Sequence, residues 1–103
     1  TWYSLDACSG QAIAYTNLLN NYPESTKGDD YKLMIVKSYY RFAKLSIIER
    51  QEERYEKVIS EYEDFADRYP ESNLLKEAES FSNLSKNHIK EIKNEQITSS
   101  VKR

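Results

Sequence analysis

The tetrapeptide Tyr-Pro-Glu-Ser occurs twice in this chain, at residues 22–25 and again at residues 69–72. The two copies contain both prolines of the 103-residue sequence, which has only two glycines. Because proline ends helices, and glycine and proline are the main turn formers, the chain has few places to reverse direction. The repeated tetrapeptide therefore predicts long helices that turn at two equivalent positions.

Apolar residues recur every three or four positions on both sides of these turns, which is the spacing of one face of an α-helix. We predict a first helix over about residues 3–22, a second from the Asp29-Asp30 pair to about 48, a third over 55–69 and a fourth from Ser72 to about 94. Asp and Ser are residue types that begin helices as N-caps. The predicted buried faces are Leu5, Cys8, Ala12, Tyr15, Leu19 and Tyr22; Tyr31, Met34, Ile35, Ser38, Phe42 and Leu45; Tyr55, Val58, Ile59, Tyr62, Phe65, Ala66 and Tyr69; and Leu75, Ala78, Phe81, Leu84, His88, Ile89 and Ile92.

Two stretches lack this periodicity. Residues 49–54 (ERQEER) are entirely polar and contain neither glycine nor proline, so they fit either a solvated helix end or a mobile connection. Residues 96–103 also lose the pattern, and we expect them to fray. The chain thus divides into one helical domain over residues 1–95, with hairpins at about 3–48 and 54–94, and a short tail.

The two halves of the chain correspond at a constant offset of 47 residues, the separation of Tyr22 and Tyr69. The offset aligns Tyr15 with Tyr62, Leu18 with Phe65, Leu19 with Ala66, Tyr31 with Ala78 and Met34 with Phe81. Apolar positions match while polar positions drift, which is typical of a duplicated helical hairpin. We therefore predict an all-α fold of two stacked antiparallel helix hairpins, a tetratricopeptide-like α-solenoid, in which the tetrapeptide is a structural joint.

Overall charge narrows the classes of partner. The formal net charge is −2 and the sequence pI is near 5.5, without the clustered lysines and arginines that nucleic-acid binding needs. No run of 18 apolar residues is present to span a membrane. We therefore expect no nucleic-acid partner and no membrane-spanning segment in this sequence.

The sequence offers few groups for catalysis or metal binding. His88, the only histidine, lies beside an apolar stripe, and Cys8, the only cysteine, lies on one, so we interpret both as packing residues. Two acidic clusters, Glu49, Glu52, Glu53 and Glu56, and Glu61, Glu63, Asp64 and Asp67, are interpreted as solvated helix faces, because hard cations prefer looped cages. We predict no catalytic, metal or cofactor site, and a function that is not enzymatic.

Aromatic side chains off the main stripes are the candidates for partner contact. Trp2, Tyr39 and Tyr40 fit this description, and aromatic residues dominate binding energy at interfaces. Each could instead pack against further repeats of a longer solenoid. A homodimer that covers the N-terminal face is a further prediction, because repeat folds usually need about three units for stability.

A family resemblance is carried by Ala12-Ile13-Ala14-Tyr15 through Ser25, Arg54-Tyr55-Glu56-Lys57, Tyr62-Glu63-Asp64-Phe65, Tyr69-Pro70-Glu71-Ser72 and Leu75-Lys76-Glu77-Ala78-Glu79. Together with the charged stretch ahead of the last helix pair, this pattern resembles the C-terminal tetratricopeptide-like region of the BamD/ComL family of outer-membrane assembly lipoproteins.

The resemblance implies a scaffold without catalytic activity on the periplasmic face of the outer membrane, in the machinery that inserts β-barrel proteins. Its partners would be protein subunits of that complex, and it would reach the membrane only through a lipid anchor outside these residues. The alternative is another periplasmic tetratricopeptide-type adaptor that binds a peptide or a partner protein.

Overall fold

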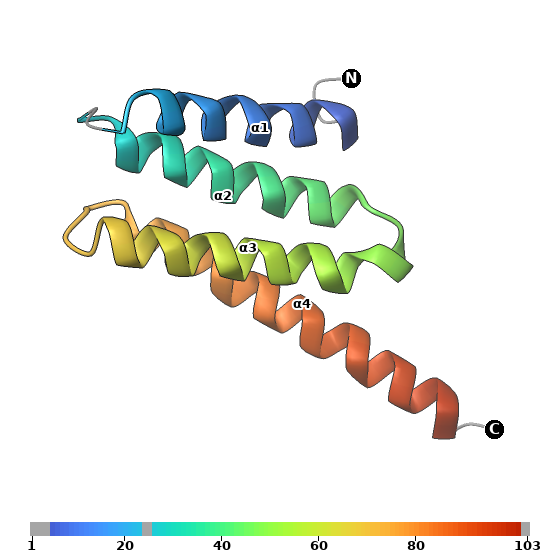
Figure 1. Cartoon of the computed structure of the whole chain (residues 1–103). Helices are drawn as coiled ribbons and strands as arrows, with labels where there is room; N and C mark the ends of the chain where they lie inside the picture. The colour runs from blue at the N-terminus through green and yellow to red at the C-terminus, as the bar shows by residue number, and fades with distance from the viewer. Residues whose placement is uncertain (1–4, 24–25, 102–103) are drawn as a thin grey trace.

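The computed structural model describes residues 5–23 and 26–101, and the side chains of residues 8–23 and 26–94. The described residues form four α-helices and no strand: α1 (Leu5–Asn21), α2 (Gly28–Leu45), α3 (Ile48–Arg68) and α4 (Leu75–Val101). In Figure 1, α1, α2 and α3 lie side by side, and α4 crosses behind α3. The prediction of an all-α arrangement of helix hairpins is confirmed.

The first residue of each Tyr-Pro-Glu-Ser copy closes its helix in the same way. The amide of Tyr22 donates a hydrogen bond to the carbonyl oxygen of Leu18 at 2.9 Å, and that of Tyr69 donates to Phe65 at 2.8 Å. The proline that follows has no amide hydrogen with which to continue the helix. The duplication seen in the sequence is therefore also present in the hydrogen bonding of the two joints.

The second joint is fastened to the start of α2. The Tyr69 ring lies directly over Gly28, where a β-carbon would overlap the Tyr69 hydroxyl. Ser72 Oγ donates a hydrogen bond to Asp29 Oδ2 at 2.7 Å and accepts one from the Leu74 amide at 3.1 Å. The predicted N-cap roles are therefore wrong: α4 begins at Leu75 after a turn that Ser72 stabilises, and Asp29 lies inside the first turn of α2.

The central helix α2 is buried on two sides. On one side Ser38 Oγ donates to Gln11 Oε1 of α1 at 3.0 Å. On the other side the core contains the cluster Val36, Tyr40, Ala43, Tyr55, Val58 and Ile92, and a second cluster of Leu33, Phe65 and Ala78. The single predicted face missed Leu33, Val36, Tyr40 and Ala43, because a helix with neighbours on both sides shows no single stripe.

The corner between α2 and α3 contains only Ser46 and Ile47, so residues 49–54 are the first turns of α3. The Gln51 side-chain amide donates to the carbonyl oxygens of Ser46, at 3.0 Å, and Lys44, at 3.4 Å. Carbonyls at a helix end otherwise lack partners within the protein. Gln51 thus caps α2, and the interpretation of this stretch as a mobile connection is wrong.

Small polar residues form part of the buried face of α4. Ser82 and Ser85 are buried, whereas Leu84, which the spacing placed on that face, is 43% exposed. The Ser85 hydroxyl donates to the carbonyl oxygen of Phe81 at 2.8 Å. The helix continues to Val101, beyond the predicted end near residue 94.

Candidate binding groove

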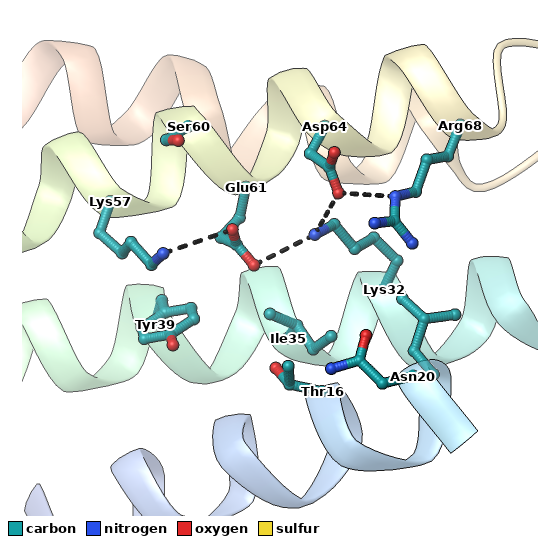
Figure 2. Close-up of a pocket in the computed structure, with 11 residues that line it drawn as sticks. Thr16, Asn20, Lys32, Ile35, Tyr39, Lys57, Ser60, Glu61, Asp64 and Arg68 are labelled. Atoms are coloured by element: carbon teal, nitrogen blue, oxygen red, sulfur yellow. Dashed lines mark hydrogen bonds and ion pairs between the residues drawn. The ribbon is translucent and has the colours of Figure 1, made fainter. Parts of the chain in front are cut away.

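An open groove of about 370 Å³ crosses α2 between α1 and α3. Figure 2 shows side chains from all three helices directed into it. The lining consists of Thr16, Leu19 and Asn20 from α1; Lys32, Ile35 and Tyr39 from α2; and Lys57, Ser60, Glu61, Asp64 and Arg68 from α3. The walls are thus the first helices of the two hairpins, and the floor is α2.

Five charged side chains form a continuous chain of ion pairs along the α2 and α3 side of the groove. Lys32 Nζ lies 3.2 Å from Glu61 Oε1 and 2.7 Å from Asp64 Oδ2. Lys57 Nζ lies 3.6 Å from Glu61 Oε2, and Arg68 Nε lies 3.0 Å from Asp64 Oδ2. Three cations thus face two carboxylates, and Figure 2 shows the four contacts as dashed lines.

Lys32 is the centre of this chain, since its side chain is only 6% exposed. A buried ammonium group requires partners, because desolvation of an unpaired charge is costly. Partial burial of Asp64 alone would raise its pKa, but the hydrogen bond and charge of Lys32, with those of Arg68, outweigh burial and hold the pKa below its ordinary value. Asp64 therefore remains ionised, and it keeps the groove wall in a fixed, charged arrangement.

The three aromatic residues predicted as partner contacts lie in different places. Tyr39 is partly buried and lines the groove, with the Lys57 ammonium 5.3 Å from its ring centre. Trp2 lies outside the described residues. Of the three, only Tyr39 is placed by the structure at a surface hollow.

The prediction that Tyr40 contacts a partner is wrong, because Tyr40 is a core residue with 9% exposure. Its ring lies 5.3 Å from Phe81 and 5.9 Å from Tyr55, measured between ring centres. Its hydroxyl lies 3.3 Å from His88 Nε2. Tyr40 therefore stabilises the fold and offers no contact to a partner on this surface.

His88 and Cys8 take the packing roles expected of them. His88 stacks on Tyr55 with ring centres 4.7 Å apart and an angle of 11° between the rings, and it meets the Tyr40 hydroxyl. Burial, with the nearby Tyr40 and Glu91, raises the pKa of Tyr55 to about 12. Cys8 is 2% exposed on the face of α1 that packs inward.

The acidic clusters differ from one another. Glu49, Glu53 and Glu56 are exposed, as a solvated face requires. Glu61 and Asp64 instead point into the groove and pair with Lys32, so the interpretation of this second cluster as purely solvated is wrong. Among the residues that the structure describes, no three His, Cys, Asp or Glu side chains are placed to hold a metal ion.

Sequence reasoning noticed Glu61 and Asp64 as part of an acidic cluster, but interpreted that cluster as solvated and missed the partner of these two residues, Lys32. Lys32 occupies a buried position on α2, beside Leu33 and one turn before Ile35 and Val36. A lysine at a position where a helix is buried indicates an ion pair with a buried or half-buried carboxylate. The sequence does not show that the position of Lys32 is buried, because this requires knowing that both sides of α2 are covered.

Comparison with known proteins gives no family for the chain: no family model matches it, and no curated protein matches it. Within the described ranges, no helix is both long enough and apolar enough to cross a membrane.

Proposed function

We propose that this chain is a protein–protein interaction scaffold that does not act as a catalyst, and that its groove between α1 and α3 binds a segment of a partner protein. The observation that carries the proposal is the groove itself, with walls from equivalent helices of two stacked hairpins. Stacked helical repeats form extended concave surfaces of this kind, and such surfaces commonly bind polypeptide segments.

The lining suits a polar, extended polypeptide better than an apolar one. Thr16, Asn20 and Ser60 present hydroxyl and amide groups at the two walls. The ion pairs add charged groups that can exchange partners with a charged side chain of the bound segment. The excess of one cation over the two carboxylates favours a segment that carries a negative charge.

By resemblance, the partner belongs to the outer-membrane machinery that inserts β-barrel proteins, and the chain works on the periplasmic face of that membrane, as in the BamD/ComL family. Long hairpins closed by Tyr-Pro-Glu-Ser joints support this proposal. A different periplasmic tetratricopeptide-type adaptor is the second candidate, and the same groove supports it, since a peptide ligand needs no further part of the machinery.

The proposal can be tested by affinity purification from outer-membrane extracts of the native organism, with co-purified proteins identified by mass spectrometry. The bait is the native protein that contains this chain, compared with its Ser60→Trp and Ser80→Trp variants. Ser60 is an exposed residue of the groove wall that makes no ion pair, so the bulky ring fills the groove. Ser80 is exposed on α4, away from the groove, and serves as the matched control.

We expect the wild-type protein and the Ser80→Trp variant to recover the large barrel-inserting subunit, and the Ser60→Trp variant to lose it. Recovery of that subunit by all three proteins would contradict the role of the groove. Recovery of cell-wall or division proteins in its place, again sensitive to Ser60→Trp, would support the adaptor and overturn the proposed family.

A further inference from the structure

Among the described side chains of α1, residues 8–21, those on the outer face are exposed and uncharged. Ile13, Leu18 and Tyr22 are 56%, 37% and 61% exposed. The other exposed residues of this helix that do not line the groove are, among its described side chains, Gly10, Ala14, Asn17 and Asn21. In a chain with 31% charged residues, an uncharged helix face with large apolar groups is typical of an interface.

The duplication indicates what should cover this face. Leu18 and Tyr22 correspond to Phe65 and Tyr69 at the offset of 47 residues. In the second hairpin these positions are covered by α2: Phe65 is fully buried with Leu33, and Tyr69 packs over Gly28. Among the described helices, α1 contacts α2 alone. The surface of α1 that carries Leu18 and Tyr22 therefore has no neighbour that corresponds to the helix α2 on Phe65 and Tyr69.

The α1 helix itself offers a matching surface. A β-carbon added at Gly10 would meet no atom within 4 Å, so this position has the free space that a partner's ring would need. If two α1 helices pair in antiparallel orientation with Gly10 beneath the partner's Tyr22, the same register sets Ala14 opposite the partner's Leu18. Small residues then face large ones at both ends of the pair, as Gly28 faces Tyr69 between α2 and α3.

We propose that a second copy of this chain covers the outer face of α1, so that the two α1 helices form the antiparallel seam of a two-fold dimer. A two-fold axis brings like side chains together, which an uncharged face tolerates and a charged one would not. This inference is independent of the proposed groove, because Gly10, Ala14 and Leu18 of the seam are not among the residues that line the groove.

The opposite end of the stack is unsuited to the same contact. On α4, the equivalents of the buried α2 residues Leu33, Val36, Tyr40 and Ala43 are Ser80, Asn83, Asn87 and Lys90, all of them exposed. Because these positions are polar in α4, its outer face is suited to contact with water and not to packing against a further helix. Head-to-tail stacking of copies, which would need an apolar α4 face, is therefore disfavoured, and the α1 seam remains.

The test is sedimentation equilibrium of the chain from micromolar to millimolar concentration. A single helix pair is at the small end of specific interfaces, so we expect a weak, concentration-dependent dimer. The variant Leu18→Glu places two carboxylates near each other in the seam and should weaken association by at least about tenfold. Leu84→Glu alters an apolar residue of similar exposure on α4 and should leave association unchanged.

The variant Gly10→Leu tests the register. In the monomer the added side chain meets open space, so the circular dichroism and thermal unfolding of the monomer should be preserved, while the dimer is lost because the partner's Tyr22 has no room. Asn17→Cys should form a disulfide between copies under mild oxidation, whereas Asn83→Cys on α4 should not. A monomer at all concentrations, or a dimer that tolerates both Leu18→Glu and Gly10→Leu, would overturn the proposal.

Discussion

The two glycines of the chain have opposite environments. Gly28, at the start of α2, lies under the Tyr69 ring, so an added β-carbon would overlap the hydroxyl, whereas a β-carbon added at Gly10 in α1 would meet open space. The Tyr69 ring cannot move away freely, because it also packs edge-on against Phe65 with ring centres 5.7 Å apart. Gly28 therefore permits the close approach that joins the two hairpins.

We predict that Gly28→Ala lowers the free energy of unfolding by about 1–2 kcal/mol, the scale of overpacking a buried contact. Gly10→Ala is the matched control and should raise the free energy of unfolding by up to about 1 kcal/mol, because alanine is the better helix former. Urea denaturation of both variants measures the difference. Equal effects of the two substitutions would show that the Tyr69 contact does not constrain this joint.

The buried phenol of Tyr55 should make the stability of the fold depend on pH in the alkaline range. The pKa of its phenol, raised by burial first and then by Tyr40 and Glu91, is about 12, against an ordinary value of 10.0. Between these values the unfolded chain loses this proton and the folded chain keeps it, so the free energy of unfolding falls as the pH rises. Below pH 10 the contribution of this group is constant.

Denaturation with urea at several pH values from about 9 to about 12 tests this expectation. The wild-type protein should lose stability across the range, and Tyr55→Phe should show a shallower loss. Tyr22→Phe is a suitable control, because Tyr22 is exposed. If Tyr55→Phe and the wild type followed the same slope, the account of the buried ring would be contradicted.

Helix α4 contains a buried polar group that makes no hydrogen bond. Within the described residues, the Ser82 hydroxyl is buried without a hydrogen-bond partner. An unsatisfied buried hydroxyl costs stability, and alanine is a better helix former than serine. Ser82→Ala should therefore raise the free energy of unfolding by about 1 kcal/mol.

The measurement is thermal or urea unfolding of Ser82→Ala beside Ser80→Ala. Ser80 lies two positions away on the exposed side of α4 and changes helix propensity by the same amount, so it isolates the effect of burial. A loss of stability in Ser82→Ala greater than in Ser80→Ala would mean that the hydroxyl makes a favourable contact.

The accuracy of the sequence predictions depends on whether the buried residues of a helix lie on one stripe or on two. Most of the inward face of α1 and that of α3 were found because each has one dominant buried stripe, which contains Cys8, Ala12 and Leu19 in one and Tyr55, Val58 and Phe65 in the other. The prediction that Tyr22 is buried with the first stripe was wrong, since it is 61% exposed. The second buried side of α2 was missed because two stripes on one helix cancel in periodicity. The start of α3 was missed because its N-cap residue, Ile47, makes no side-chain hydrogen bond and is not a typical capping residue.

The groove was only partly predictable for a related reason. The duplicated hairpins place their first helices, α1 and α3, along one surface, where they form the walls of the groove. The ion pairs within the groove were not predictable, because the sequence around Glu61 and Asp64 is that of an exposed helix face. Only the tertiary structure shows that Lys32 of α2 lies between the two carboxylates. Contacts between residues about 30 positions apart are not encoded in local spacing.

For the whole molecule, the duplicated hairpin produces three different surfaces. The groove between α1 and α3 is polar and charged, the outer face of α1 over its described side chains is uncharged and partly apolar, and the outer face of α4 is polar. These differences suit three roles: segment binding, pairing with a second copy, and closure of the stack. The first of them is the central claim of the proposed function.

Site-specific photocrosslinking in living cells of the native organism tests that claim most directly. A photoreactive amino acid is placed at Asn20 in the groove and, as the matched control, at Asn83 on the outer face of α4; both residues are exposed asparagines. We predict one discrete crosslinked partner from position 20 and none from position 83. No adduct at position 20, or the same adducts at both positions, would contradict a binding function for the groove.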